Sequence, residues 1–478
     1  MNMKQLKNQT LLASVLTDGK GQQVFNPFDD SLLATVPMSC QAKIEHDVVE
    51  MEAGQKAWQK KPVSERCQLM KKWHQLILQN EDDLAMLITL EGGKPLKEAL
   101  GEVRYGASFI EWFAEEGRRA YGNTIPSASN DKTILTVKQA IGVAAAITPW
   151  NFPLAMITRK AAPALAAGCS FICKPSESTP LTAFAVTELA YQAGIPKDVL
   201  RMVVGENAHD VGEVFTYHPS VRKFSFTGST LVGRKLQMQC ASTIKRTSME
   251  LGGNAPFIVF DDADIDSAVK GAIASKFRNA GQTCVCANRF YVQEAVYDEF
   301  IQKLVAEVDK LKVGNGLDES TDIGPLISKE AKQRVSDLIE EAKGRGARQI
   351  NQERSLEGNF IAPTILIDVE HDRPLVQGEI FGPVLPIIRF SEEDKMIAMA
   401  NDTIYGLAAY FYSQDMNRIW RVAHNLEYGM VGVNEGIIST EVAPFGGMKQ
   451  SGNGREGAKE GLEEYLETKY VCIGGLDR

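Results

Sequence analysis

Apolar residues in the first quarter of the chain recur at intervals of three and four. Between Gln41 and about Arg119 this spacing predicts a series of amphipathic helices. Beyond it, short apolar runs alternate with helical windows. We expect strands at 133–137, 141–147, 170–173, 200–204 and 223–226, with helices near 182–193, 207–216 and 231–240. This rhythm predicts an α/β fold with a parallel, doubly wound sheet, which binds ligands at the carboxyl ends of its strands.

The pattern restarts after Leu251-Gly252-Gly253, which indicates a second α/β domain. Its expected strands are 256–260, 289–292, 361–366, 384–390, 407–412 and 429–433, and its expected helices are 263–279, 296–311 and 328–343. The C-terminal run from Tyr465 to Ile473 is apolar and β-prone, so it is suited to pair with another domain or subunit. We therefore place a domain boundary near Glu250.

Composition narrows the classes of function. With 478 residues the chain is too long for one hydrophobic core. A net charge of −9 argues against a nucleic-acid-binding surface. Eight cysteines are too sparse for a disulfide framework, and no Cys/His cluster has zinc spacing, so we expect no metal site. We see no signal-type segment and no run of 18 apolar residues, so we expect a cytoplasmic enzyme without a membrane partner.

The segment Gly281-Gln282-Thr283-Cys284 places a cysteine on a loop after an expected helix, where its sulfur could meet a substrate. A buried, inert thiol is the alternative, because free cysteines are often buried. A cysteine hydrolase, acyltransferase or esterase would need a histidine base, and none of the six histidines lies in a motif-like setting. A carboxylate does: Glu250 stands at a strand end before two glycines, although a lone glutamate there is more often a surface residue.

Six sequence motifs, taken together, point to one family. They are Gly281-Gln282-Thr283-Cys284, Met249-Glu250-Leu251-Gly252-Gly253, Pro149-Trp150-Asn151-Phe152-Pro153, Phe226-Thr227-Gly228-Ser229-Thr230, Glu379-Ile380-Phe381-Gly382-Pro383 and Pro444-Phe445-Gly446-Gly447. In type and spacing the chain, from about residue 24 to its end, resembles the NAD(P)-dependent aldehyde dehydrogenase superfamily. The resemblance implies a dinucleotide-binding domain (1–250, with bridging strands near 120–142) and a catalytic domain (251–440). Residues 441–478 would return to the cofactor domain and supply a C-terminal bridging strand.

The resemblance also implies the roles of the catalytic residues. Cys284 would attack the aldehyde to give a thiohemiacetal. The amide of Asn151 and the backbone N–H of Cys284 would stabilise its oxyanion. After hydride transfer, Glu250 would activate the water that hydrolyses the thioester, and would help to deprotonate Cys284. Because relatives that transfer the acyl group to coenzyme A typically lack this glutamate, Glu250 favours release of a free acid.

The cofactor residues follow from the same resemblance. They are Thr148, Pro149, Trp150, Lys174, Ser176, Glu177, Thr227, Gly228, Ser229, Leu251, Glu379 and Phe381. We expect NAD rather than NADP, because a carboxylate at Glu177 can accept hydrogen bonds from the ribose 2′-hydroxyl and would repel a 2′-phosphate. NADP remains an alternative, because Glu177 can rotate away and Lys174 suits a phosphate. The segment from Gly452 to Gly457 fits G-x-G-x-x-G but does not follow a strand, so we interpret it as a loop.

Three further segments narrow the expected class of substrate. Ala274-Ser275-Lys276-Phe277-Arg278-Asn279 and Met156-Ile157-Thr158-Arg159-Lys160 resemble the succinate-semialdehyde dehydrogenases, as does Asn434-Glu435-Gly436-Ile437-Ile438-Ser439. A distal carboxylate needs a cationic anchor, so we expect Arg159 and Arg278 to form a clamp, with Ser439 as a further donor. Taken singly, each arginine is more often a surface residue. Glutarate semialdehyde and simple aliphatic aldehydes remain alternative substrates.

Two further expectations concern redox state and assembly. The Cys284-Val285-Cys286 spacing, also typical of the succinate-semialdehyde group, raises the hypothesis that Cys286 is a redox partner of Cys284; a packed small residue is the alternative. The resemblance implies that bridging strands pair across subunits, so we expect a homo-oligomer, either a dimer or a tetramer.

Overall fold

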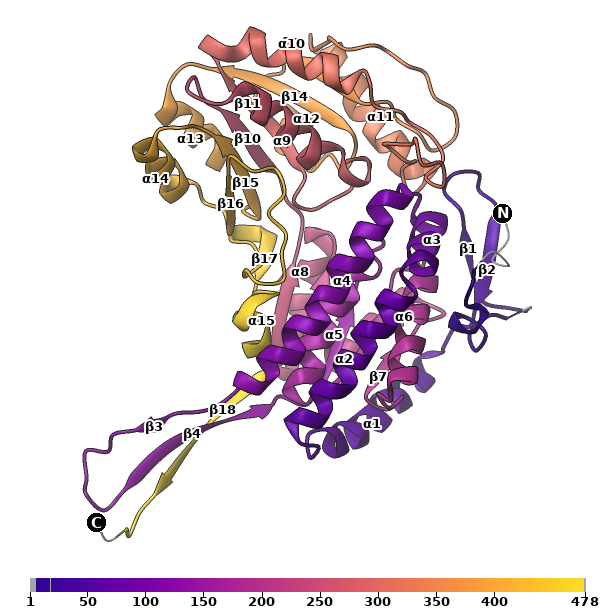
Figure 1. Ribbon diagram of the computed structural model, residues 1–478, viewed down its shortest axis with the longest axis vertical. Coiled ribbons are helices and arrows are strands. Elements are labelled where there is room, and N and C mark those ends of the chain that lie inside the picture. The colour runs from indigo at the N-terminus through magenta and orange to yellow at the C-terminus, as the bar shows by residue number, and fades with distance from the viewer. Residues whose placement is uncertain (1–5, 18, 477–478) are drawn as a thin grey trace.

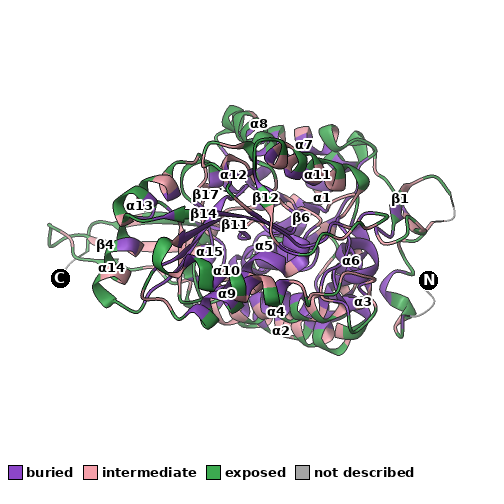
Figure 2. Ribbon diagram, turned by 90° about the horizontal axis from the view of Figure 1, so that it is seen from above, coloured by how far each residue is buried: buried purple, intermediate pink, exposed green. Residues whose placement is uncertain are grey.

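The computed structural model of the protein describes residues 6–17 and 19–476. Two large sheets lie in separate halves of the molecule, and a narrow β arm projects from one of them (Figure 1). The buried residues concentrate on the strands and on the helix faces turned toward them (Figure 2). This is the expected α/β class with two sheets.

The first sheet has the order β17-β9-β8-β5-β6-β7. Its strands are β5 (Val143–Ile147), β6 (Ser170–Lys174), β7 (Leu200–Met202), β8 (Val221–Thr227), β9 (Arg246–Glu250) and β17 (Gly452–Asn453). All neighbours are parallel except β17, which pairs antiparallel with β9. The segment from Gly452 to Gly457 is therefore not simply a loop, because its first two residues extend the sheet.

Helices cover both faces of this sheet, because its central strands are apolar on both sides. Ala144 and Ala146 of β5 pack into one core, with α2 (Val63–Gln79), α3 (Glu81–Gly92), α4 (Leu96–Glu116), α5 (Ala155–Ala167) and α6 (Pro180–Ala193). Val143 and Ala145 point the other way, into a core with α1 (Gln41–Trp58), α7 (Ala208–Tyr217) and α8 (Thr230–Cys240). The two-residue alternation of a strand thus separates the two helical layers.

The second sheet has the order β12-β13-β14-β11-β10-β15-β16. Its strands are β10 (Ala255–Val259), β11 (Ala287–Gln293), β12 (Arg348–Gln349), β13 (Thr364–Ile367), β14 (Val384–Phe390), β15 (Ala408–Tyr412) and β16 (Met430–Val433). Its helices are α9 (Ile265–Phe277), α10 (Tyr297–Val308), α11 (Lys329–Gly344), α12 (Pro374–Gln377), α13 (Glu393–Asn401) and α14 (Met416–Asn425). Because β9 ends at Glu250 and β10 begins at Ala255, we propose residues 251–254 as the link between the dinucleotide-binding and catalytic domains.

Helix α9 ends earlier than the expected 279. Asn279 and Ala280 adopt left-handed φ values of 53° and 55°, which an α-helix cannot continue. This turn, Arg278–Gly281, redirects the chain toward Cys284.

The arm is a three-stranded antiparallel sheet in the order β18-β4-β3. Strand β18 (Leu466–Ile473) pairs along its whole length with β4 (Thr133–Ala140), and β3 (Thr124–Ile125) lies on the other side of β4. The described end of the chain lies at the tip of the arm (Figure 1). The remaining elements are the hairpin β1 (Gln22–Phe25) and β2 (Leu32–Val36), and the short α15 (Ala458–Glu463).

Candidate active site

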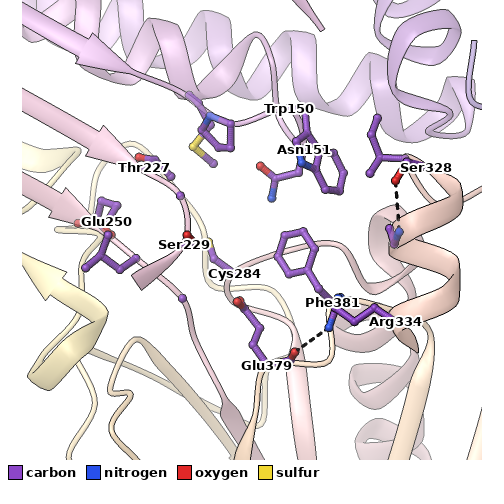
Figure 3. Close-up of a pocket in the computed structure, with 17 residues that line it drawn as sticks. Trp150, Asn151, Thr227, Ser229, Glu250, Cys284, Ser328, Arg334, Glu379 and Phe381 are labelled. Atoms are coloured by element: carbon purple, nitrogen blue, oxygen red, sulfur yellow. Dashed lines mark hydrogen bonds between the residues drawn. The ribbon is translucent and has the colours of Figure 1, made fainter. Parts of the chain in front are cut away.

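A cavity of about 420 Å³ lies at the carboxyl edge of the first sheet, where the two halves face each other. The register of the sheet aligns Ile147 with Lys174 and Phe226, and Thr227 with Glu250, so these strands end at one edge. The lining residues are Pro149, Trp150, Asn151, Met156, Thr227, Gly228, Ser229, Glu250, Leu251, Gly252, Cys284, Ile327, Ser328, Ala331, Arg334, Glu379 and Phe381. In Figure 3, Thr227, Ser229 and Glu250 approach from the sheet, whereas Ser328 and Arg334 come from α11 and its N-cap.

Cys284 is a free, half-buried thiol that lines this cavity. Burial raises the pKa of Cys284 to about 12, although the positive charge of Arg159 opposes the shift. The thiol is therefore protonated at neutral pH, and forming the nucleophilic thiolate requires a proton acceptor nearby.

Glu250 lies in the same cavity and is 2% exposed. Neither of its carboxylate oxygens has a hydrogen-bond partner among the described residues. Burial, reinforced by the negative charge of Glu456, raises the pKa of Glu250 well above its ordinary value. A carboxylate with a raised pKa and free lone pairs is chemically suited to accept a proton from a thiol or from water.

Asn151 completes a group of three polar residues in the cavity. Its Nδ2 donates to the backbone oxygen of Gln282 at 3.0 Å, which ties the β5 loop to the loop that carries Cys284. An amide has two N–H donors, so the other remains available for an oxyanion. Cys284, Glu250 and Asn151, which the sequence motifs predicted to act together, thus line one cavity.

Eight of the expected cofactor residues also line this cavity: Pro149, Trp150, Thr227, Gly228, Ser229, Leu251, Glu379 and Phe381. The rings of Trp150 and Phe381 meet edge to face, with centroids 5.6 Å apart. Ser229 caps α8, whose N-terminus offers amide donors that suit a phosphate. A Cβ at Gly228 would lie 2.6 Å from the Phe226 ring, so the turn needs a glycine. This edge therefore has the shape and donors that a dinucleotide requires.

Glu379 is held on both sides. Its Oε1 accepts from the backbone N–H of Gly253 at 3.2 Å, and Arg334 donates to its backbone oxygen at 3.3 Å (Figure 3). Burial raises the pKa of Glu379 to about 7.

The other four expected cofactor residues, Thr148, Lys174, Ser176 and Glu177, do not line this cavity. The backbone N–H of Thr148 donates to the oxygen of Lys174 at 3.1 Å, which places both at the same sheet edge. Lys174 forms an ion pair with Glu177. Glu177 lines an adjoining cavity of about 440 Å³, which shares Ile327 and Ser328 with the first.

The three residues expected to bind the substrate carboxylate do not lie in the cavity lining, where a simple clamp would place them. Arg159, Arg278 and Ser439 are not among the residues that line the cavity. Arg159 is 1% exposed and is ion-paired to Glu456, with its guanidinium 4.2 Å from the centroid of the Phe445 ring. Its Nη2 has no hydrogen-bond partner among the described residues. Arg159 is therefore buried beside the cavity rather than in its lining, and its part in a carboxylate clamp stays a prediction.

Arg278 is half-buried, and its guanidinium lies 5.3 Å from the centroid of the Phe152 ring. Burial raises the pKa of the Tyr105 phenol, and the charges of both Arg159 and Arg278 oppose that shift, which places Tyr105 close to both arginines. Ser439 is half-buried in the segment that follows β16.

Cys286 is buried and free, and its thiol donates to the backbone oxygens of Lys276 at 3.5 Å and Ala287 at 3.4 Å. This packed setting agrees with the alternative of a small core residue, and the redox role remains a hypothesis.

Several site residues had no signal in the sequence. Ile327, Ser328, Ala331 and Arg334 reach the cavity through packing of distant elements. Glu456, inside the G-x-G-x-x-G segment, reaches the catalytic region and pairs with both Arg159 and Lys160. Within the described residues, no group of His, Cys, Asp and Glu could hold a metal ion, and no helix has the length and apolar character to cross a membrane.

Comparison with known proteins agrees with this geometry. The aldehyde dehydrogenase family matches residues 15–471. A glutarate-semialdehyde dehydrogenase from Pseudomonas putida is 55% identical, with 95% of each chain covered. The NADP(+)-dependent succinate-semialdehyde dehydrogenase of Escherichia coli is 54% identical, with 96% of this chain and 95% of that one covered.

A solved aldehyde dehydrogenase from Brucella melitensis biovar abortus superposes with a TM-score of 0.97 at 54% identity, covering 99% of this chain and 100% of that one. The chain belongs to the aldehyde dehydrogenase family and is an oxidoreductase.

Proposed function

We propose that this protein oxidises a semialdehyde with a distal carboxylate, with succinate semialdehyde as the preferred substrate, to the free dicarboxylic acid. The observation that carries the proposal is the cavity in which Cys284, Glu250 and Asn151 meet, with Arg159, Arg278 and Tyr105 grouped behind it. The guanidinium of Arg159 and the hydroxyl of Tyr105 beside it are donors from which a carboxylate would accept hydrogen bonds. The names of the semialdehyde dehydrogenases among the relatives support the same substrate class.

The residues present divide the reaction between them. Glu250 takes the thiol proton, and Cys284 sulfur attacks the aldehyde carbon to form a thiohemiacetal. The free N–H of Asn151 and the backbone N–H of Cys284 stabilise the oxyanion. Trp150, Ser229 and Phe381 would hold the nicotinamide cofactor, which would supply the hydride acceptor. Glu250 then removes a proton from the water that attacks the thioester, which releases the acid and restores the thiol.

For the cofactor we expect NAD to be preferred over NADP. The carboxylate of Glu177 at the adjoining cavity would repel a 2′-phosphate, whereas its ion pair with Lys174 neutralises part of that charge. Discrimination should therefore be modest, and both nucleotides should support turnover.

The test is steady-state kinetics of reduced-nicotinamide formation with succinate semialdehyde, glutarate semialdehyde and butyraldehyde, each with NAD and with NADP. We expect kcat/KM to be highest for succinate semialdehyde and at least about 10-fold lower for butyraldehyde, because the lost charge-assisted hydrogen bonds are worth about 1.5–3 kcal/mol. Cys284→Ser should abolish turnover. Equal values for the semialdehydes and butyraldehyde would contradict the carboxylate specificity, and cleavage of esters without any nicotinamide reduction would favour a cysteine esterase or acyltransferase.

Glutarate semialdehyde is the second candidate, because the P. putida relative carries that name. One additional methylene in such a site changes the transition-state energy by only about 1–3 kcal/mol. The same experiment ranks the two.

We also propose a homo-oligomer, a dimer or tetramer, assembled through the arm. Tyr470 is 61% exposed and Tyr121, beside β3, is 74% exposed. Large apolar side chains on a thin projecting sheet are better explained by a partner strand than by water.

A further inference from the structure

Three charged residues follow one another at intervals of four positions: Lys94, Glu98 and Glu102. Lys94 lies just before α4, and Glu98 and Glu102 lie on one face of that helix. Lys94 and Glu102 are buried and form an ion pair, and Glu98 is half-buried. Charges are costly to remove from water unless they are paired and hydrogen-bonded, so their partners indicate their role.

The Lys94–Glu102 pair holds the loop of Asn151. Lys94 Nζ donates to the backbone oxygen of Asn151 at 2.9 Å, and its ammonium lies 3.8 Å from the centroid of the Phe152 ring. Glu102 Oε1 accepts from the backbone N–H of Leu154 at 2.9 Å and of Ala155 at 3.3 Å, where α5 begins. The backbone is thus fixed on both sides of Phe152, which leaves the Asn151 amide little freedom.

Glu98 holds the loop of Cys284 in the same way. Its Oε2 accepts from the backbone N–H of Asn279 at 2.7 Å. Asn279 and Ala280 both have left-handed φ values, a conformation that costs about 1–3 kcal/mol for a residue with a side chain and persists only when neighbours enforce it. Asn279 Nδ2 in turn donates to the oxygens of Asn151 at 3.1 Å and of Gln282 at 3.3 Å.

The two loops are therefore bonded to each other and to a single helix face. We propose that Glu98, together with the Lys94–Glu102 pair, is a positioning residue that sets the separation of the Asn151 amide and the Cys284 backbone in the oxyanion hole. The inference rests on the proposed function, because it assumes an oxyanion at Cys284. Oxyanion donors act only when they lie about 2.7–3.1 Å from the developing charge, and a displacement of 1 Å costs about 100-fold in rate.

The test compares Glu98→Leu, which removes the acceptor, with Glu98→Gln, which keeps an amide oxygen for the Asn279 N–H. Glu111→Leu is the matched control, because Glu111 is an exposed carboxylate on the same helix. We expect kcat of Glu98→Leu to fall by about 10–100-fold with KM for the semialdehyde and for NAD(P) within about twofold of wild type. Glu98→Gln should recover most of the loss, and Glu111→Leu should match wild type.

Asn279→Gly provides a second route if Glu98→Leu does not fold. Glycine keeps the left-handed backbone but removes the donor that bridges the two loops, so it should lower kcat in the same selective way. Wild-type kcat in a folded Glu98→Leu variant, an equal loss in Glu98→Leu and Glu98→Gln, or wild-type kcat in Asn279→Gly would each overturn the inference. The proposed function is tested separately, by the wild-type protein alone. It would be contradicted if the wild type formed no NAD(P)H from any aldehyde.

Discussion

Two acidic groups in the cavity, Cys284 and Glu250, stay protonated to a higher pH than they would in water, and burial is the main cause for both. Burial raises the pKa of the Cys284 thiol and of the Glu250 carboxyl, and their negative charges oppose each other. The positive charge of Arg159 lowers both pKa values, whereas the negative charge of its ion-pair partner Glu456 raises the pKa of Glu250. At the residue scale, activity therefore depends on deprotonating one buried group with another.

Glu250→Gln should slow both halves of the reaction. No carboxylate would then accept the thiol proton of Cys284 or activate the water, so steady-state turnover should fall by about 100–10,000-fold. Rapid mixing should therefore show no fast burst of NAD(P)H. Full steady-state turnover in the variant would contradict the role of Glu250.

The pH dependence has a defined sign. Because the pKa of Glu250 is raised, the wild type should lose activity as pH falls through that elevated value, not through the ordinary range near 4.5. The folded protein also binds this proton more tightly than the unfolded chain, so the carboxyl lowers stability as pH rises from about 4.5 through the folded pKa. Glu250→Gln should therefore have a higher Tm than wild type at pH 8, and a lower one would contradict the burial argument.

Arg278→Met tests the clamp at a residue that is half-buried. KM for succinate semialdehyde should rise by about 10–100-fold, equivalent to about 1.5–3 kcal/mol, whereas KM for butyraldehyde should stay within about twofold. Arg345→Met, at an exposed ion-paired arginine at the end of α11, is the control. An equal rise for both aldehydes would show that Arg278 shapes the site without binding the carboxylate.

At the scale of elements, the loop between α9 and Cys284 shows where sequence periodicity stops being informative. The helical pattern predicted α9 well but extended it to 279, because apolar spacing carries no signal for the left-handed φ of Asn279 and Ala280. That turn is enforced by tertiary contacts, including the Glu98 hydrogen bond. The central strands β5, β6, β8 and β14, in contrast, lie close to their expected runs, because strands buried on both faces appear as continuous apolar runs. The short edge strands β12 and β17 were not predicted.

Gly281→Ala should be damaging for a reason specific to this loop. Gly281 has φ +76°, and a Cβ there would lie 2.4 Å from the backbone oxygen of Gly382. We expect a loss of about 1–3 kcal/mol in the free energy of unfolding and a fall of kcat of about 10-fold or more. Gly346→Ala is the matched control, because its φ is also positive but its surroundings are open; a similar kcat loss there would contradict the argument.

At the scale of the molecule, the site lies between two halves, and the arm projects from one of them (Figure 1). The double variant Tyr470→Glu/Ile473→Glu places charges on both faces of β18, where the two side chains are 61% and 43% exposed. If the arm joins subunits, light scattering after size-exclusion chromatography should show a mass falling toward 52.5 kDa. Trp420→Glu, on the exposed face of α14 at 78% exposure, should leave the mass unchanged. A wild type of 52.5 kDa would rule out the oligomer.

The chain's own order of residues was enough to place most of the central strands and the longer helices, and it pointed to the motif residues Cys284, Glu250 and Asn151, because apolar periodicity and motifs can be read within short stretches of sequence. Packing alone decided that Arg159 is buried against Glu456, that α11 supplies Ser328 and Arg334, and that α4 holds both catalytic loops. These contacts join segments separated by tens to hundreds of positions. They depend on strand order and helix docking, which no window of the sequence contains.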